Sequence, residues 1–149
     1  MTARDATAGE TTTGGVATGD VAAGGGAPPD VANLNDLLTG KEHDHGGLGT
    51  ILAHRVFSRA EGGEGAEFVD LAVLPPGTSI GRHRHGADRE TYIVLSGSGL
   101  MYRDGAEFRV TTGDVVVNRP HGEHGLVNDS AAELWLLVFE EELRDGSGV

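Results

Sequence analysis

The chain has 149 residues, no cysteine, and a formal charge of −12 that arises from 23 acidic residues against 11 Lys and Arg. This length suits one domain, and the absence of thiols excludes disulfides and leaves His, carboxylate or backbone oxygen as ligands for any metal. The acidic charge weighs against nucleic acid and anionic membrane as partners, because binding to either needs clustered Lys and Arg.

Residues 1–32 differ in composition from the rest of the chain. Ala, Gly and Thr supply 21 of these 32 residues, and the segment holds no aromatic residue, no Leu and no Ile. Such a segment cannot bury enough apolar surface to offset the entropy of ordering, so we predict a disordered arm. It lacks the apolar stretch of a secretory signal, and the chain has no apolar run of about 18 residues that would span a membrane. We therefore expect a cytoplasmic protein.

The segment 33–143 is predicted to form one all-β domain, and 144–149 a frayed tail. A helical turn is expected from Asn33 to Leu38, capped by Asn33 or Asn35, followed by a loop over 40–49. Short runs rich in β-formers then alternate with turn signals. They predict strands at 50–57, 67–74, 90–96, 99–103, 106–110, 114–118 and 133–141.

Two features of these strands indicate how they are arranged. Asp104-Gly105 separates two of them and suits a type I′ hairpin turn. The strand at 133–141 is apolar on both faces, so we expect one face to line a pocket and the other to pack against a second sheet or a second subunit. Many short strands without a long helix indicate a small antiparallel β-barrel or sandwich, which can enclose one ligand.

Four residues form a candidate metal site. His83 and His85 are two residues apart, so on a strand both imidazoles point to one face. Glu90 opens the next predicted strand, and antiparallel pairing of the two strands is expected to bring its carboxylate beside the imidazoles. His124 follows a later strand and a turn, and it completes the set. Three imidazoles and a carboxylate suit one divalent metal and leave positions open for substrate, water or dioxygen.

The spacing of these residues resembles the two sequence motifs of the cupin superfamily. Residues 77–97 (GTSIGRHRHGADRETYIVLSG) fill every fixed position of the first motif. Residues 113–128 (GDVVVNRPHGEHGLVN) match the glycine, histidine and asparagine of the second, with the inner Pro-x-Gly displaced by one residue. The resemblance covers roughly residues 50–140 and implies a jelly-roll barrel, the double-stranded β-helix of this family.

The resemblance also implies a cofactor, a partner and a function. The cofactor is one divalent transition metal ion (Fe, Zn, Mn or Ni), and the partner is a second copy in a homodimer. Because cupins include dioxygenases, decarboxylases, isomerases and polyketide cyclases, we expect a metal-dependent enzyme acting on a small oxygen-chelating substrate. A tailoring step of secondary metabolism, by cyclisation, isomerisation, rearrangement or oxygenation, is favoured. The alternative is a non-catalytic, metal-dependent binding protein or sensor for a small molecule.

Glu90, Tyr92 and His121 are the candidate catalytic residues. Tyr92 shares the inward face of its strand with Glu90, and it either hydrogen-bonds a substrate or packs in the core. His121 lies three residues before His124, and it is a competing metal ligand, a proton shuttle at the pocket mouth or an exposed turn residue.

Two further groups leave alternatives open. His43 and His45 form a second His-x-His, but no acid follows at a fitting distance, so we favour a structural loop near the barrel mouth over a second metal site. Arg82, Arg84 and Arg89 surround the first pair of histidines. They form either a local basic rim or solvated surface charge.

Overall fold

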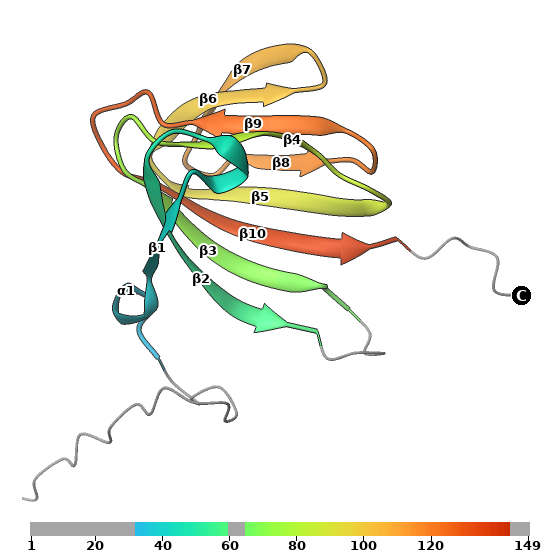
Figure 1. The fold of residues 1–149 in the computed structure, drawn as a ribbon, viewed down its shortest axis with the longest axis horizontal. Coiled ribbons are helices and arrows are strands. Elements are labelled where there is room, and N and C mark those ends of the chain that lie inside the picture. The colour runs from blue at the N-terminus through green and yellow to red at the C-terminus, as the bar shows by residue number, and fades with distance from the viewer. Residues whose placement is uncertain (1–31, 60–64, 144–149) are drawn as a thin grey trace, which may run out of the picture. The chain divides into compact units, whose positions relative to one another are not determined.

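The computed structural model describes residues 32–59 and 65–143 (Figure 1). Residues 1–31 of the predicted arm, and the predicted tail, lie outside the described residues. The first element is the short helix α1 (Leu34–Leu37), and the backbone N–H of Asn35 donates to the side chain of its N-cap, Asn33. Within the described ranges no helix is long and apolar enough to cross a membrane.

The rest of the described chain is antiparallel β-structure in two sheets (Figure 1). One sheet has the order β1-β2-β3-β10-β5-β8, the other has the order β4-β9-β6-β7, and a 3-10 turn, η1 (Asp44–Gly46), lies between β1 and β2. The predicted antiparallel β-fold is therefore confirmed. The strands are β1 (Thr39–Glu42), β2 (Thr50–Ser58), β3 (Phe68–Leu74), β4 (Ser79–Arg84), β5 (Asp88–Ser96), β6 (Ser98–Arg103), β7 (Ala106–Thr111), β8 (Val115–Asn118), β9 (Glu123–Val127) and β10 (Leu134–Glu142).

The locally encoded features agree with the sequence prediction. Every predicted strand is present, with its ends shifted by at most two residues. Asp104 and Gly105 join β6 to β7 with φ values of 49° and 87°. Positive φ at both positions is what a type I′ hairpin turn requires.

Three strands lie outside the predicted ranges, and one predicted pairing is wrong. Of these strands, β4 was expected only through the spacing of His83 and His85. The exposed segment β1 was expected to be a loop, but it pairs with β2, and β9 was not foreseen. The strand with His83, β4, does not pair with the strand that carries Glu90, β5. Instead, β4 pairs with β9, whereas β5 lies in the other sheet between β10 and β8. Glu90 therefore approaches the histidines from the facing sheet.

The core lies between the two sheets. On β10, Leu134, Leu136 and Val138 face inward and are at most 5% exposed. Their alternate neighbours lie on the other face of the six-stranded sheet and are half-buried. The homodimer stays a prediction.

Candidate metal centre

Strand β4 and its extension place two imidazoles toward the barrel interior. Residues alternate along this strand, so Arg82 and Arg84 are exposed while His83 and His85 are half-buried. His83 lies opposite His124 in the register between β4 and β9. Direct cross-strand partners point to the same face, so this pairing adds a third imidazole to the first two.

The fourth side chain comes from β5 in the facing sheet. Glu90 Oε2 lies 2.8 Å from His124 Nε2 and 3.3 Å from His85 Nε2. The Nε2 atoms of His83 and His85 are 3.2 Å apart, and one ligand atom from each of the four residues lies within 4.8 Å of the others. Metal–ligand bonds of about 2.1 Å at right angles would space neighbouring ligand atoms about 3 Å apart. The group could therefore hold a metal ion.

Hydrogen bonds on the other ring nitrogens orient two of the imidazoles. The Nδ1 of His83 lies 2.9 Å from the carbonyl oxygen of Gly81. The Nδ1 of His85 contacts the carboxylate of Asp88, which also accepts a bond from the backbone N–H of Gly86 at 3.0 Å. An Nδ1–H donor in each ring leaves the Nε2 lone pair free to bind a cation.

The surroundings of the Glu90 carboxylate suit a metal ligand better than an acidic residue with a purely structural role. Its side chain is 8% exposed, yet Oε2 makes no hydrogen bond within the described residues although two imidazoles lie close to it. When both imidazoles are neutral and carry their proton on Nδ1, this buried charged oxygen has no donor, which is costly. A divalent cation at the centre of the cluster would satisfy it.

The pKa values in the metal-free site reflect the same contacts. Burial alone would raise the pKa of Glu90, but the imidazoles of His124 and His85 outweigh burial and lower it to about 2. The contact with Glu90, reinforced by Asp88, raises the pKa of His85 to about 9 even though burial opposes this. Burial lowers the pKa of His83. Without metal, His85 is therefore positively charged at neutral pH, with a proton on both ring nitrogens.

We expect metal binding to strengthen as pH rises, because the ion must displace the proton held by His85. The apparent dissociation constant should fall about tenfold for each pH unit and level off above the pKa of about 9. Competition with a chromophoric chelator over a range of pH measures this. Asp88→Asn removes one of the carboxylates that raise the pKa of His85. In this variant the dissociation constant should therefore level off at a lower pH than in wild type. A wild-type dissociation constant that does not change with pH would contradict the prediction.

The structure places the other two predicted catalytic residues differently. Tyr92 is 2% exposed, and its hydroxyl oxygen lies 3.2 Å from His124 Nε2. His121 is exposed in the turn before β9, and its backbone carbonyl accepts a bond from Arg84. Tyr92 lines the cavity beside the cluster, whereas His121 does not. Their catalytic roles stay predictions.

That cavity has a volume of about 260 Å³ and opens on His85 and Glu90. Strands β1 and β2 contribute Lys41 and Arg55 to its wall, and β10 contributes Glu140. Glu140 lies directly opposite Glu90 in the pairing of β5 and β10. Burial, together with the charges of Asp88 and Glu90, raises the pKa of Glu140 to about 7. Sequence reasoning missed Lys41, Arg55 and Glu140, since nothing in their local pattern separates them from surface charges.

The second His-x-His lies closer to the site than expected. The ring of His45 stacks on His83, with ring centroids 3.7 Å apart and an interplanar angle of 11°. His45 also lines the cavity, while His43 bonds back to its own loop at the carbonyl of Gly47. The loop is therefore one wall of the candidate site, and the spacing of its histidines gave no indication of the stacking.

The three arginines around the first motif do not form a common rim. Arg82 pairs with Glu107 at 3.0 Å on the outside of the four-stranded sheet, and Arg84 bonds to the backbone of the turn before β9. Arg89 pairs with Glu141. Arg82 and Arg84 share the exposed face of β4, whereas Arg89 lies on β5 in the other sheet.

Comparison with known proteins agrees with the motifs seen in the sequence. The family profile described as Cupin domain matches residues 70–140, the segment that contains all four residues of the cluster. An oxalate-binding protein of Thermotoga maritima is 30% identical over 94 residues, which cover 62% of this chain and 77% of that protein.

Solved structures resemble the same part of the molecule. A predicted oxalate decarboxylase from Thermotoga maritima has a TM-score of 0.69 at 25% sequence identity, covering 72% of this chain and 93% of that chain. A Cupin 2 conserved barrel domain protein from Salinispora arenicola has a TM-score of 0.60 at 22% identity, covering 77% and 89%. The second likeness is one of fold alone.

Proposed function

This chain belongs to the cupin family, and from that premise we propose that it is a metal-dependent enzyme acting on a small oxygen-chelating organic acid in the barrel cavity. His83, His85, Glu90 and His124 would hold the ion. When bound, a divalent metal supplies a Lewis acid for the chelating oxygens of the substrate. The observation that carries the proposal is that the cavity of about 260 Å³ opens directly on two of these four residues.

Arg55 in the cavity wall supports an acidic substrate. The guanidinium of Arg55 is fixed by two bonds to Asp70, at 2.8 and 2.9 Å, and it lies 3.9 Å from the ring centroid of Phe68. A guanidinium held in this way keeps further N–H donors for a second ligand. In our proposal it binds the end of the acid that is remote from the metal. Lys41 also lines the cavity, where it is paired with Asp44 at 2.5 Å.

Two groups on the inner wall can handle protons. Glu140 has a pKa of about 7, so its carboxyl both gives and takes a proton near neutral pH. The hydroxyl of Tyr92 is a donor beside His124, and burial raises its pKa well above the usual range. We propose that these groups serve the reaction. Its class would be one of the cyclisations, isomerisations, rearrangements or oxygenations expected from the sequence, or a decarboxylation.

Oxalate is the first acid to test, because a relative and a solved structure from Thermotoga maritima, both similar to this chain, are named for it. Protein reconstituted with Mn²⁺, Fe²⁺, Zn²⁺ or Ni²⁺ in turn is titrated with oxalate and with larger chelating acids, and substrate loss is followed by NMR. We expect saturable, metal-dependent binding that Arg55→Gln weakens about tenfold, the value of one charge-assisted hydrogen bond. Arg109→Gln, which removes an exposed charge paired with Asp129, is the matched control.

The outcomes separate the two candidate functions. Binding together with consumption of the acid supports an enzyme. Binding without consumption favours the alternative, a metal-dependent binding protein, which agrees with the name of the oxalate-binding relative. If no chelating acid binds the metal-loaded protein, or if Arg55→Gln binds as tightly as wild type, the proposed site is wrong.

A further inference from the structure

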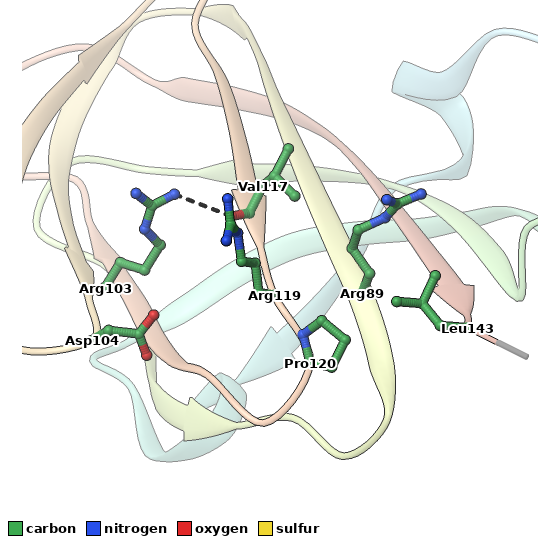
Figure 2. A pocket seen from close by; sticks show the side chains of 7 residues that line it. All are labelled: Arg89, Arg103, Asp104, Val117, Arg119, Pro120 and Leu143. Carbon is green, nitrogen blue, oxygen red and sulfur yellow. Dashed lines mark hydrogen bonds between the residues drawn. The ribbon is translucent and has the colours of Figure 1, made fainter. Parts of the chain in front are cut away.

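A second hollow, with a volume of about 670 Å³, lies apart from the cavity at the metal cluster. The two share no lining residue. Figure 2 shows that its walls come from β5, β6, β8 and the chain that follows β8 and β10. We call it the arginine groove, after Arg89, Arg103 and Arg119, and its apolar wall consists of Val117, Pro120 and Leu143.

Two of these arginines lack an acidic partner in the part of the chain that the structure describes. Arg89 is paired with Glu141, at 3.0 Å from its Nε. Arg103 and Arg119 make no salt bridge within the described residues, unlike the other arginines that form ion pairs there. The nearby carboxylate of Asp104 instead accepts the backbone N–H of Glu123 at 2.8 Å.

The guanidinium of Arg103 is held in place. Its Nη1 donates to the carbonyl of Val117 at 3.0 Å, the bond drawn in Figure 2, and its Cζ lies 5.5 Å from the ring centroid of Phe108. Fixing one arm of a guanidinium lowers the entropy that a ligand must remove to bind the other donors. Arg103 is therefore prepared to receive an anion.

The groove also has apolar surface next to these charges. Val117 is 37% exposed and Leu143 is 40% exposed, and Pro120 also lines the groove (Figure 2). A ligand that uses both surfaces needs an anionic group for the arginines and an apolar body for this wall. A volume of this size falls in the range of small-molecule sites.

We propose that the arginine groove is a second ligand site, which binds a small organic anion with a phosphate or carboxylate group and an apolar body. A guanidinium can donate two parallel hydrogen bonds to two oxygens of a phosphate or of a carboxylate. Neither Arg103 nor Arg119 has a salt-bridge partner within the described residues, and an anion would supply one, although the carboxylate of Asp104 also lines the groove. The site is independent of the metal centre and of the function proposed for it.

Phenyl phosphate is the probe, and inorganic phosphate tests whether the apolar body contributes. The full chain, labelled with ¹³C in its methyl groups, is titrated with each probe. We expect saturable shifts at the methyl groups of Val117 and Leu143, and none at Ile51 and Val138, which line the other cavity. Phenyl phosphate should bind more tightly than inorganic phosphate.

The variants make the test specific. Arg103→Gln and Arg119→Gln should each weaken phenyl phosphate binding about tenfold. Arg109→Gln removes the same charge outside the groove and should change the affinity little. Three outcomes would overturn the proposal: no saturable shift at Val117 and Leu143, shifts confined to Ile51 and Val138, or equal weakening by Arg109→Gln.

Discussion

Replacing His124 with Ala is expected to empty the metal centre, so that metal content falls from about one ion per chain to nearly none. His124 is 1% exposed and lies 2.8 Å from the carboxylate of Glu90, at the middle of the cluster. Its loss removes one of the four ligands and leaves a buried space where the imidazole lay. Elemental mass spectrometry on protein purified without chelators measures the change.

The matched control is His54→Ala, because His54 lies on β2, away from the cavity and the cluster. This variant should keep its metal. Since a metal that binds only the folded state stabilises it, His124→Ala should melt below metal-loaded wild type. Comparison with metal-free wild type separates this effect from the cavity left by the missing ring. Unchanged metal content in His124→Ala would disprove the assignment.

The identity of the metal directs the later work. Iron or nickel at about one ion per chain would favour oxygenation as the reaction. Zinc or manganese would favour cyclisation, isomerisation or rearrangement. A wild-type protein that takes up no metal even after reconstitution would exclude the metal-dependent function altogether.

Gly81→Ala is expected to lower the free energy of unfolding by about 3 kcal/mol, through overpacking of backbone against backbone. A Cβ at position 81 would lie 2.1 Å from the carbonyl oxygen of His45 and 2.7 Å from the N of Gly47. A Cβ on Gly47 would in turn meet the carbonyl of Ser79 at 2.2 Å. Backbone atoms cannot rotate away, so the loop that carries His45 must move off β4 and off the ring of His83.

Gly86→Ala is the control for this prediction. The new Cβ there would meet only Asp88 Oδ1, at 3.4 Å, which is ordinary contact. Urea unfolding of both variants and of wild type, all without metal, measures the difference. If Gly81→Ala lies within about 1 kcal/mol of wild type, the close packing of the loop on β4 does not exist as described. The NMR shifts of the His83 ring protons report whether the His45 ring still stacks.

The features that the sequence predicted correctly depend on neighbours along the chain. Alternating β-formers predicted most of the strands, and Asp104-Gly105 predicted the hairpin between β6 and β7. The two-residue period of a strand is a property of its own backbone, so it also predicted that His83 and His85 point the same way. Composition fixed the available ligand chemistry, because a chain without cysteine holds a metal through imidazole and carboxylate.

Features that depend on strand partners were decided by the tertiary structure. Glu90 was expected on a strand paired with β4, but β5 lies in the facing sheet, and only the packing of the two sheets brings its carboxylate to the imidazoles. The exposed strand β1 has no hydrophobic alternation and exists because it pairs with β2. The sequence does not state which strands pair, since this choice follows from the burial of the whole core.

Charged residues and histidines show most clearly that the sequence does not state which segments meet. Arg89 looked like a neighbour of Arg82, yet it shares a groove with Arg103 and Arg119, which come from other strands. His45 was expected in a structural loop, and it stacks on His83 because Gly47 and Gly81 let two backbones meet. The sequence by itself determined most of the strands, the shared face of the histidines and the ligand types, because these follow from local periodicity and composition. Only the tertiary structure decided which charges and rings meet, because that depends on contacts between segments far apart in the chain.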